Sequence, residues 1–232
     1  MVEKQGKILV IACNVLKHEL EAVDGCGVCV EFLEQGLHRT PSKMPAAIQE
    51  IIDQTGEDVD YIVLGYGTCG SGIVGVKAGR QPLVIPRAHD CISFWLGSAE
   101  AHRKEHEKVP GTYYLTRGYI EEGQAPLDSY EEYKERFGEE TARWVINEEF
   151  KNYTRVALID TGAYDLEAYR PTARATAKFL GLAYEEIDGS LDFFKKIISG
   201  EWDEKKFIIL PPGEEFTQAT MLEILGYKKP AG

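Results

Sequence analysis

Five short apolar runs, separated by segments of helical character, constrain the fold of this chain more than any other feature. The runs occupy residues 8–12, 61–64, 83–85, 156–159 and 207–210. Strands that are apolar along their whole length are buried on both faces, and such strands alternate with helices in mainly parallel sheets. We therefore expect an α/β fold, with a mainly parallel sheet and helices on both of its faces.

Two segments share a pattern that bears on domain organisation. RVALIDTGAYD, residues 155–165, resembles KILVIACNVLK, residues 7–17, because each is an apolar run that ends in a small or polar turn before a helix. This shared pattern suggests two similar lobes, although the sequence identity between the two segments is too low to define a repeat. We expect an N-terminal α/β lobe that carries the site over residues 1–123. A helical linker or insertion should follow over residues 124–152, and a C-terminal α/β lobe over residues 153–232.

Charge and hydropathy limit the partners. Asp and Glu outnumber Lys and Arg by 38 to 26, and the resulting net charge of -12 repels nucleic acid and anionic membrane surfaces. No apolar stretch approaches the roughly 20 residues of a membrane span, and the first residues show no signal-peptide cleavage site. We expect a cytoplasmic protein without nucleic-acid or membrane partners. Its five cysteines then fit reduced thiols or metal ligands better than disulfides.

Potential metal ligands follow the apolar runs. Cys13 comes after the first run, Cys69 lies in a glycine-dense loop after the second, and His89 and Cys91 follow the third. Ligands bind at the carboxyl ends of parallel strands, where these side chains would converge. Thiolate-rich ligation favours zinc, or an iron-sulfur cluster, over magnesium or calcium. His38, which lies in a loop that enters a helix, is the reserve ligand.

Other side chains near the same strand ends suit a small-molecule ligand. Arg80 and Arg87 are candidate clamps for an anionic group, since a guanidinium binds carboxylate and phosphate well. Asp90 can hold a neighbouring ligand side chain in place, and one tyrosine of the pair at 113–114 can reach a ligand while the other packs. Asp160, after the fourth run, is expected among the ligand-binding residues, and it is the one candidate general base of the second lobe.

Three further patterns carry less weight. GYGTCG, residues 65–70, matches the dinucleotide fingerprint, but the glycine-rich segment 71–80 that follows is a poor helix former. Cys26 and Cys29 form a single CxxC pair, with no second pair at the spacing of a zinc ribbon, and we expect peripheral thiols. His102 and His106 are four residues apart, but their surroundings, AHRKEHEK, predict a solvated helix face.

The segments IACNVLKHELEAV, GLHRTP, LGYGTCGSGIVGVKAGRQPLVIPRAHDCISFWLGS and PGTYYLTRGYI together resemble a prokaryotic family catalogued as domain of unknown function 1638. The resemblance places the following residues on the family pattern: Cys13, His38, Tyr66, Cys69, Gly70, Arg80, Arg87, His89, Asp90, Cys91 and Tyr114. It also implies a setting, because such proteins occur in anaerobic archaea and bacteria, often encoded beside corrinoid-dependent methyltransferase systems. Methylamine or betaine metabolism is the implied context, and no reaction is identified.

We therefore expect a metal-binding protein that acts on or binds a small anionic or methylated-amine metabolite, linked to corrinoid-dependent methyl transfer. Zinc is the expected metal. The alternative is a non-catalytic module that binds a corrinoid or another small molecule and serves a methyltransferase system. In either case the expected partners are a small-molecule ligand and a corrinoid protein or methyltransferase, and the sequence leaves open whether the protein is an enzyme.

Overall fold

The computed structural model describes residues 7–23, 25, 27–68, 71–123 and 125–227. Cys69 and Gly70 of the expected site, and Cys26 of the CxxC pair, lie outside these residues. The helical elements are η1 (Asn14–Leu16), α1 (Lys17–Ala22), η2 (Gln35–Arg39), η3 (Pro41–Lys43), α2 (Met44–Gln54), α3 (Ile92–Trp95), α4 (Ala99–Lys108), α5 (Arg117–Glu121), α6 (Pro126–Phe137), α7 (Glu139–Phe150), η5 (Leu166–Ala168), α8 (Arg170–Leu180), α9 (Asp192–Ile198) and α10 (Gln218–Ile224).

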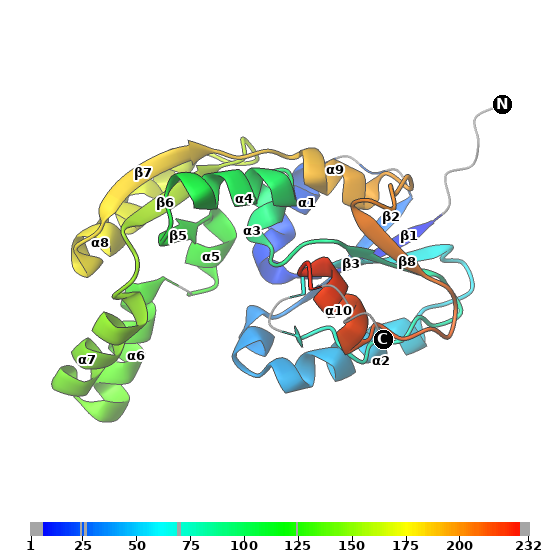
Figure 1. Cartoon of the computed structure of the whole chain (residues 1–232), viewed down its shortest axis with the longest axis horizontal. Coiled ribbons are helices and arrows are strands. Elements are labelled where there is room, and N and C mark those ends of the chain that lie inside the picture. The colour runs from blue at the N-terminus through cyan, green and yellow to red at the C-terminus, as the bar shows by residue number, and fades with distance from the viewer. Residues whose placement is uncertain (1–6, 24, 26, 69–70, 124, 228–232) are drawn as a thin grey trace.

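The larger of two sheets has five strands in the order β2-β1-β3-β4-β8 (Figure 1). These are β2 (Val28–Leu33), β1 (Ile8–Cys13), β3 (Tyr61–Gly65), β4 (Leu83–Pro86) and β8 (Phe207–Leu210). The first four strands run parallel, and β8 is antiparallel to β4. The parallel register puts the carboxyl ends of β1, β3 and β4 at one edge, which is where the sequence places most of its candidate site residues.

The smaller sheet has three parallel strands in the order β5-β6-β7. They are β5 (Thr112–Leu115), β6 (Arg155–Asp160) and β7 (Ala183–Asp188), with α8 packed on β6 and a helical hairpin of α6 and α7 beside them. The expected α/β fold with mostly parallel strands is confirmed. The apolar runs did not include the edge strands β2, β5 and β7, and the side chains of β2 and β7 are exposed or half-buried rather than fully buried.

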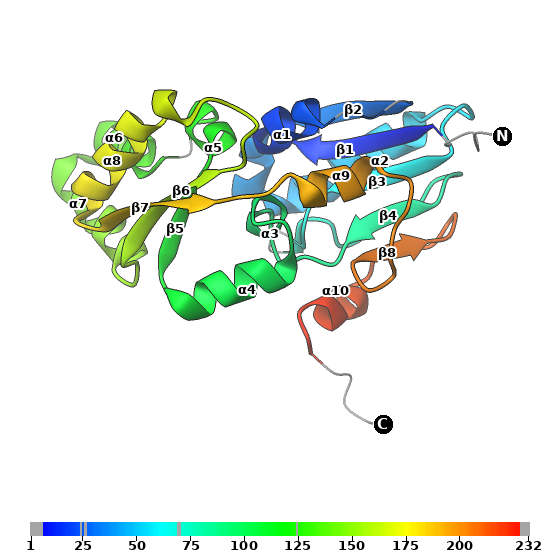
Figure 2. The same ribbon diagram turned by 90° about the horizontal axis from the view of Figure 1, so that it is seen from above.

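Sheet membership crosses the boundaries expected from the sequence. β5 lies before residue 123 and pairs with β6, while β8 lies after residue 153 and pairs with β4. The chain passes from the larger to the smaller sheet between α3 and α4, and it returns between β7 and α9 (Figure 2). We call the part around each sheet a lobe.

The lobes are in direct contact. Ala157 and Ile159 of β6 belong to the same buried apolar cluster as the strands of the larger sheet, and Trp95 at the end of α3 is fully buried in it. Helices α2 and α9 lie on opposite sides of the larger sheet and bury Ile48 and Phe194 in this core (Figure 1). Over the described residues, no helix is both long and apolar enough to cross a membrane.

Candidate functional site

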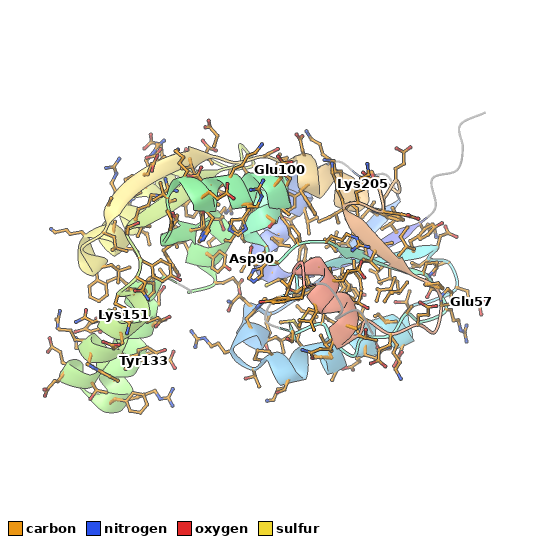
Figure 3. The ribbon with its side chains drawn as sticks, in the orientation of Figure 1. Glu57, Asp90, Glu100, Tyr133, Lys151 and Lys205 are labelled. Carbon is orange, nitrogen blue, oxygen red and sulfur yellow. The ribbon has the colours of Figure 1, made fainter. Side chains whose placement is uncertain are left out.

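A cavity of about 1000 Å³ lies between the turn after β4, helix α4 and strand β5. We call it the cleft. Arg87, His89 and Asp90 come from the turn after β4, so the edge that the parallel strands predict does carry part of the lining. The other lobe supplies Tyr113 and Tyr114. The cleft therefore lies between the two lobes, and Asp90 is central in the molecule (Figure 3).

Asp90 connects two imidazoles. Its Oδ2 atom lies 2.9 Å from His89 Nδ1, and its Oδ1 atom lies 3.4 Å from His102 Nδ1. Oδ1 also accepts a hydrogen bond of 3.0 Å from the backbone N–H of Ile92, which fixes the carboxylate at the start of α3. Because both oxygens are engaged, the side chain is held in one orientation and can orient both rings.

His102 is the less exposed of these two histidines, with 18% of its side chain accessible against 71% for His89. Ser93 Oγ lies 3.3 Å from the same Nδ1 atom that faces Asp90. Burial lowers the pKa of His102, and the Asp90 carboxylate opposes that shift. Both described polar contacts of the ring are therefore made by Nδ1, which leaves Nε2 for a ligand.

Tyr114 brings a buried hydroxyl to the cleft. Its ring meets the His102 ring edge-on, with centroids 5.7 Å apart. Its Oη atom is buried and has no hydrogen-bond partner among the described residues. The Thr112 hydroxyl donates to Val109 O and accepts from Arg155 Nε, and it also acts on the Tyr114 hydroxyl, where it opposes the rise in pKa that burial causes. An unpaired buried hydroxyl costs free energy, and because this oxygen is covered, a ligand in the cleft would reach it only after the surrounding side chains move.

The two arginines expected to clamp an anion lie far apart. Arg87 lines the cleft, where its Nε donates to Glu204 O at 2.9 Å and its Nη1 pairs with Glu223 at 3.2 Å. Arg80 precedes β4, at the opposite end of that strand, and pairs with the exposed Glu57 at 2.6 Å. Glu57 is remote from Asp90 (Figure 3), so Arg80 and Arg87 do not act on one group.

Two of the described thiols, Cys13 and Cys91, are buried, whereas Cys29 is exposed. Cys13 is buried at the end of β1, and burial raises the pKa of its thiol to about 11, so the thiol is neutral at physiological pH. Cys91 is also buried, and its Sγ lies 3.5 Å from the Tyr119 hydroxyl. Burial of Cys13 disfavours its thiolate form.

His38 and Tyr66 form a separate contact. Their rings stack with centroids 6.1 Å apart, and burial lowers the pKa of His38. Within the described part of the chain, no group of three or more His, Cys, Asp and Glu side chains is arranged to hold a metal. Because Cys69 lies outside that part, the expected site at Cys13, Cys69, His89 and Cys91 stays a prediction.

Asp160 is exposed at the end of β6 and is not part of the cleft lining. Its Oδ1 accepts a hydrogen bond of 2.9 Å from the backbone N–H of Gly162, which makes it a turn-forming side chain. It does not contact the other expected site residues that the structure describes.

Sequence reasoning missed several lining residues, and those with basic side chains come from α4. His102, Arg103 and His106 line the cleft, although the charged surroundings of the two histidines predicted a solvated face. That prediction holds for His106, which is exposed, and is wrong for His102. The usable signal was the spacing of four residues, which puts both rings on one side of a helix.

A family model described as Protein of unknown function (DUF1638) matches residues 32–198. The matched range is more than half of the 232 residues and includes every described residue of the cleft except Ile224 and Leu225. A search of curated proteins and a search of solved structures each found no match. The family description names no activity, so the function has to be argued from the geometry of the cleft.

Proposed function

The chain belongs to this family, Protein of unknown function (DUF1638), and we propose that it binds a small anionic metabolite in the cleft, where His102 exchanges a proton with the ligand. The observation that carries the proposal is the placement of His102, which lines the cleft with its Nδ1 atom held by Asp90 and with no described polar contact at Nε2. An imidazole positioned in this way suits proton exchange with an oxygen-bearing group.

The charge of the lining supports an anion. Two arginines and three histidines line the cleft, against Asp90 as the single acidic residue of the described lining, although Arg87 also pairs with Glu223 and Arg103 with Glu107. The chain as a whole carries a net charge of -12, so this concentration of cationic and protonatable groups is local. Clefts lined mainly by one sign of charge attract ligands of the opposite sign.

The size of the cleft supports a small molecule. Its volume of about 1000 Å³ is at the upper end of the range of about 300–1,000 Å³ typical of small-molecule sites. Tyrosines, Ile92 and Leu225 provide apolar lining next to the polar groups. The ligand would therefore combine an anionic group with an apolar or aromatic part.

His102 suits general acid-base work better than activation of a nucleophile. In a Ser-His-Asp triad the serine and the aspartate meet different ring nitrogens, whereas here Ser93 and Asp90 both meet Nδ1. Ser93 is also almost fully buried. With Nδ1 held by Asp90, the ring keeps one orientation, and Nε2 can accept or donate the proton of a bound ligand.

The finer expectations remain predictions. A zinc ion, a methylated-amine ligand and a link to corrinoid-dependent methyl transfer rest on the sequence pattern and the family resemblance. An iron-sulfur cluster or a bound corrinoid is the alternative that the sequence left open.

Calorimetry with three probes tests the proposal: inorganic phosphate, succinate, and tetramethylammonium as the cationic control. We expect at least one anion to bind and the cation to give no heat. Arg87→Ala should weaken anion binding about tenfold or more, because a guanidinium makes charge-assisted hydrogen bonds to such groups. The matched control is Arg80→Ala, at the far end of the same strand, which should bind as the parent does. Equal weakening by both variants, or stronger binding of the cation, would show the proposal to be wrong.

A further inference from the structure

Two segments that connect the lobes run side by side. Ser190 donates its backbone N–H to Trp95 O at 2.8 Å, and Gly189 donates to Asp160 O at 2.7 Å. A Cβ atom added at Gly97, which has φ of +82°, would lie 2.9 Å from Ser190 Cβ. We call residues 96–98 and 189–191 the hinge, because both passages of the chain between the sheets occur there.

A glutamate is buried next to the hinge. Glu19 of α1 has 0% of its surface exposed. Its Oε1 atom accepts a hydrogen bond of 3.3 Å from Thr161 Oγ1, so it joins the larger-sheet lobe to the loop after β6. Its Oε2 atom and the Trp95 Nε1 atom are both buried without a geometrically formed hydrogen bond among the described residues, and the Trp95 indole is the donor that acts on the carboxyl group. A Cβ added at Gly189 would lie 2.9 Å from Thr161 Cγ2 and 2.9 Å from Trp95 O, so the hinge packs directly on the residues around this carboxyl group.

The charged neighbours of Glu19 are already paired with each other. Arg117 of α5 is a cationic group that acts on the carboxyl, but its Nε donates to Glu121 at 2.8 Å. His18, the preceding residue on α1, also lies against Glu121, at 2.5 Å. The remaining titratable groups of this region are Tyr164 and Asp160, which carry no positive charge. Glu19 therefore has no ion pair with a described residue.

Burial raises the pKa of Glu19 to about 7, and this rise is opposed by the Trp95 indole, the Thr161 hydroxyl and Arg117. The carboxyl group is consequently neutral in this arrangement at mildly acidic pH. Ionisation would put an unpaired charge in a closed apolar interface, which is costly unless water reaches it.

We propose that Glu19 is a proton-operated latch on the hinge: with its proton bound it holds the two lobes together, and loss of the proton favours opening of the hinge. This inference concerns the lobes themselves and does not depend on what the cleft binds. Opening would also widen the cleft, because its lining is shared between the same two lobes.

The sign of the pH dependence follows from linkage. In an open hinge the carboxyl group meets water and returns to an ordinary pKa of about 4.3, whereas the closed hinge binds the proton more tightly. The equilibrium constant for opening should therefore rise by about tenfold per pH unit between about pH 5 and pH 7, and level off above that range.

Amide hydrogen exchange of Gly189 and Ser190, followed by NMR from pH 5 to pH 8 and divided by the intrinsic rates, measures that opening. In the parent protein, the protection factors of both amides should fall about tenfold per pH unit between pH 5 and pH 7. Glu19→Gln keeps a neutral acceptor for Thr161 and should show protection that does not change with pH. Glu21→Gln, on the exposed side of the same helix, should behave like the parent.

Two results would overturn the latch. One is a Glu19→Gln variant that keeps the parent's pH dependence, and the other is a parent protein whose hinge protection is flat. If Glu19→Gln does not fold, the Cδ resonance of Glu19 in the parent protein decides: its titration midpoint must coincide with the pH at which protection levels off. Neither phosphate nor succinate is added in these experiments, so their outcome is separate from that of the calorimetry.

Discussion

Asp90 Oδ1 lies 3.4 Å from His102 Nδ1, and this contact joins the turn after β4 to helix α4. The two residues are in different elements, and only one of them belonged to the site expected from the sequence. The contact has a consequence for protonation, because a carboxylate favours the charged form of a nearby imidazole.

Asp90→Asn should lower the pKa of His102 further. Burial already lowers it, and the Asp90 charge is the group that opposes burial. The variant removes that charge while keeping the shape of the side chain, so the imidazole should remain neutral to a more acidic pH. NMR titration of the His102 ring resonances measures the shift. Asp192→Asn on α9 is the control and should leave the midpoint unchanged, and a midpoint that rises in Asp90→Asn would contradict the geometry.

Tyr114→Phe should stabilise the protein. The hydroxyl is buried and unpaired among the described residues, so its removal should increase the free energy of unfolding by about 1 kcal/mol. Tyr164→Phe is the matched control, because Tyr164 Oη accepts from Arg117 N and donates to Ile159 O. That control should lower the free energy of unfolding by about 1–2 kcal/mol. Urea denaturation compares the two, and a destabilised Tyr114→Phe would mean that the hydroxyl has a partner within the protein.

Gly118→Ala should strongly weaken the contact between α5 and η1. A Cβ at this position would lie 1.9 Å from Val15 O. Val15 O is a backbone atom, so it cannot move away by a side-chain rotation. We expect a loss of about 3 kcal/mol or more in the free energy of unfolding, at the upper end of overpacking effects. Gly36→Ala tests the specificity of this argument, since the nearest atom to its added Cβ is 4.0 Å away. Its effect should stay within about 0.5 kcal/mol, and equal losses in both variants would refute the steric explanation.

Arg155→Met should destabilise the smaller sheet and weaken the packing of α4 against it. The Arg155 side chain is 4% exposed and forms ion pairs with Glu105 of α4 and Glu185 of β7. Loss of one partner of a buried pair costs about 3–5 kcal/mol, and the lower end applies here because Glu185 is half-exposed. Adding Glu105→Gln should recover part of the loss, since it removes the charge left behind. Thermal and urea unfolding of both variants would settle this, with the exposed Arg103→Met as the control expected to stay within about 0.5 kcal/mol.

The zinc prediction has a direct chemical test. Elemental analysis of protein purified without oxygen, with its absorption spectrum, should show zinc and no colour if the expected ligands bind it. Cys91→Ser should then lose most of the metal, because it removes a thiolate ligand, while the exposed Cys29→Ser should keep it. Brown absorption would indicate an iron-sulfur cluster and red absorption a corrinoid. Metal-free parent protein, or equal loss in both variants, would rule out the expected site.

The location of the site could be partly predicted from the sequence. Arg87, His89 and Asp90 follow an apolar run, and the rule that ligands bind at the carboxyl ends of parallel strands places them in the cleft. Arg80 shows the limit of this reasoning, because the sequence separates it from Arg87 by one short strand, and that strand carries the two residues to opposite ends.

The apolar periodicity by itself determined the class of fold and the position of the central strands, because burial on both faces forces a continuous apolar run. Only the tertiary structure decided that β8 returns to pair with β4, that His102 faces Asp90, and that Glu19 is buried beside the hinge. Each of these depends on which distant segments pack together, and Glu19 and Thr161 are 142 residues apart in the chain. A local sequence pattern indicates that a strand is buried, but it does not indicate which distant segment packs against that strand.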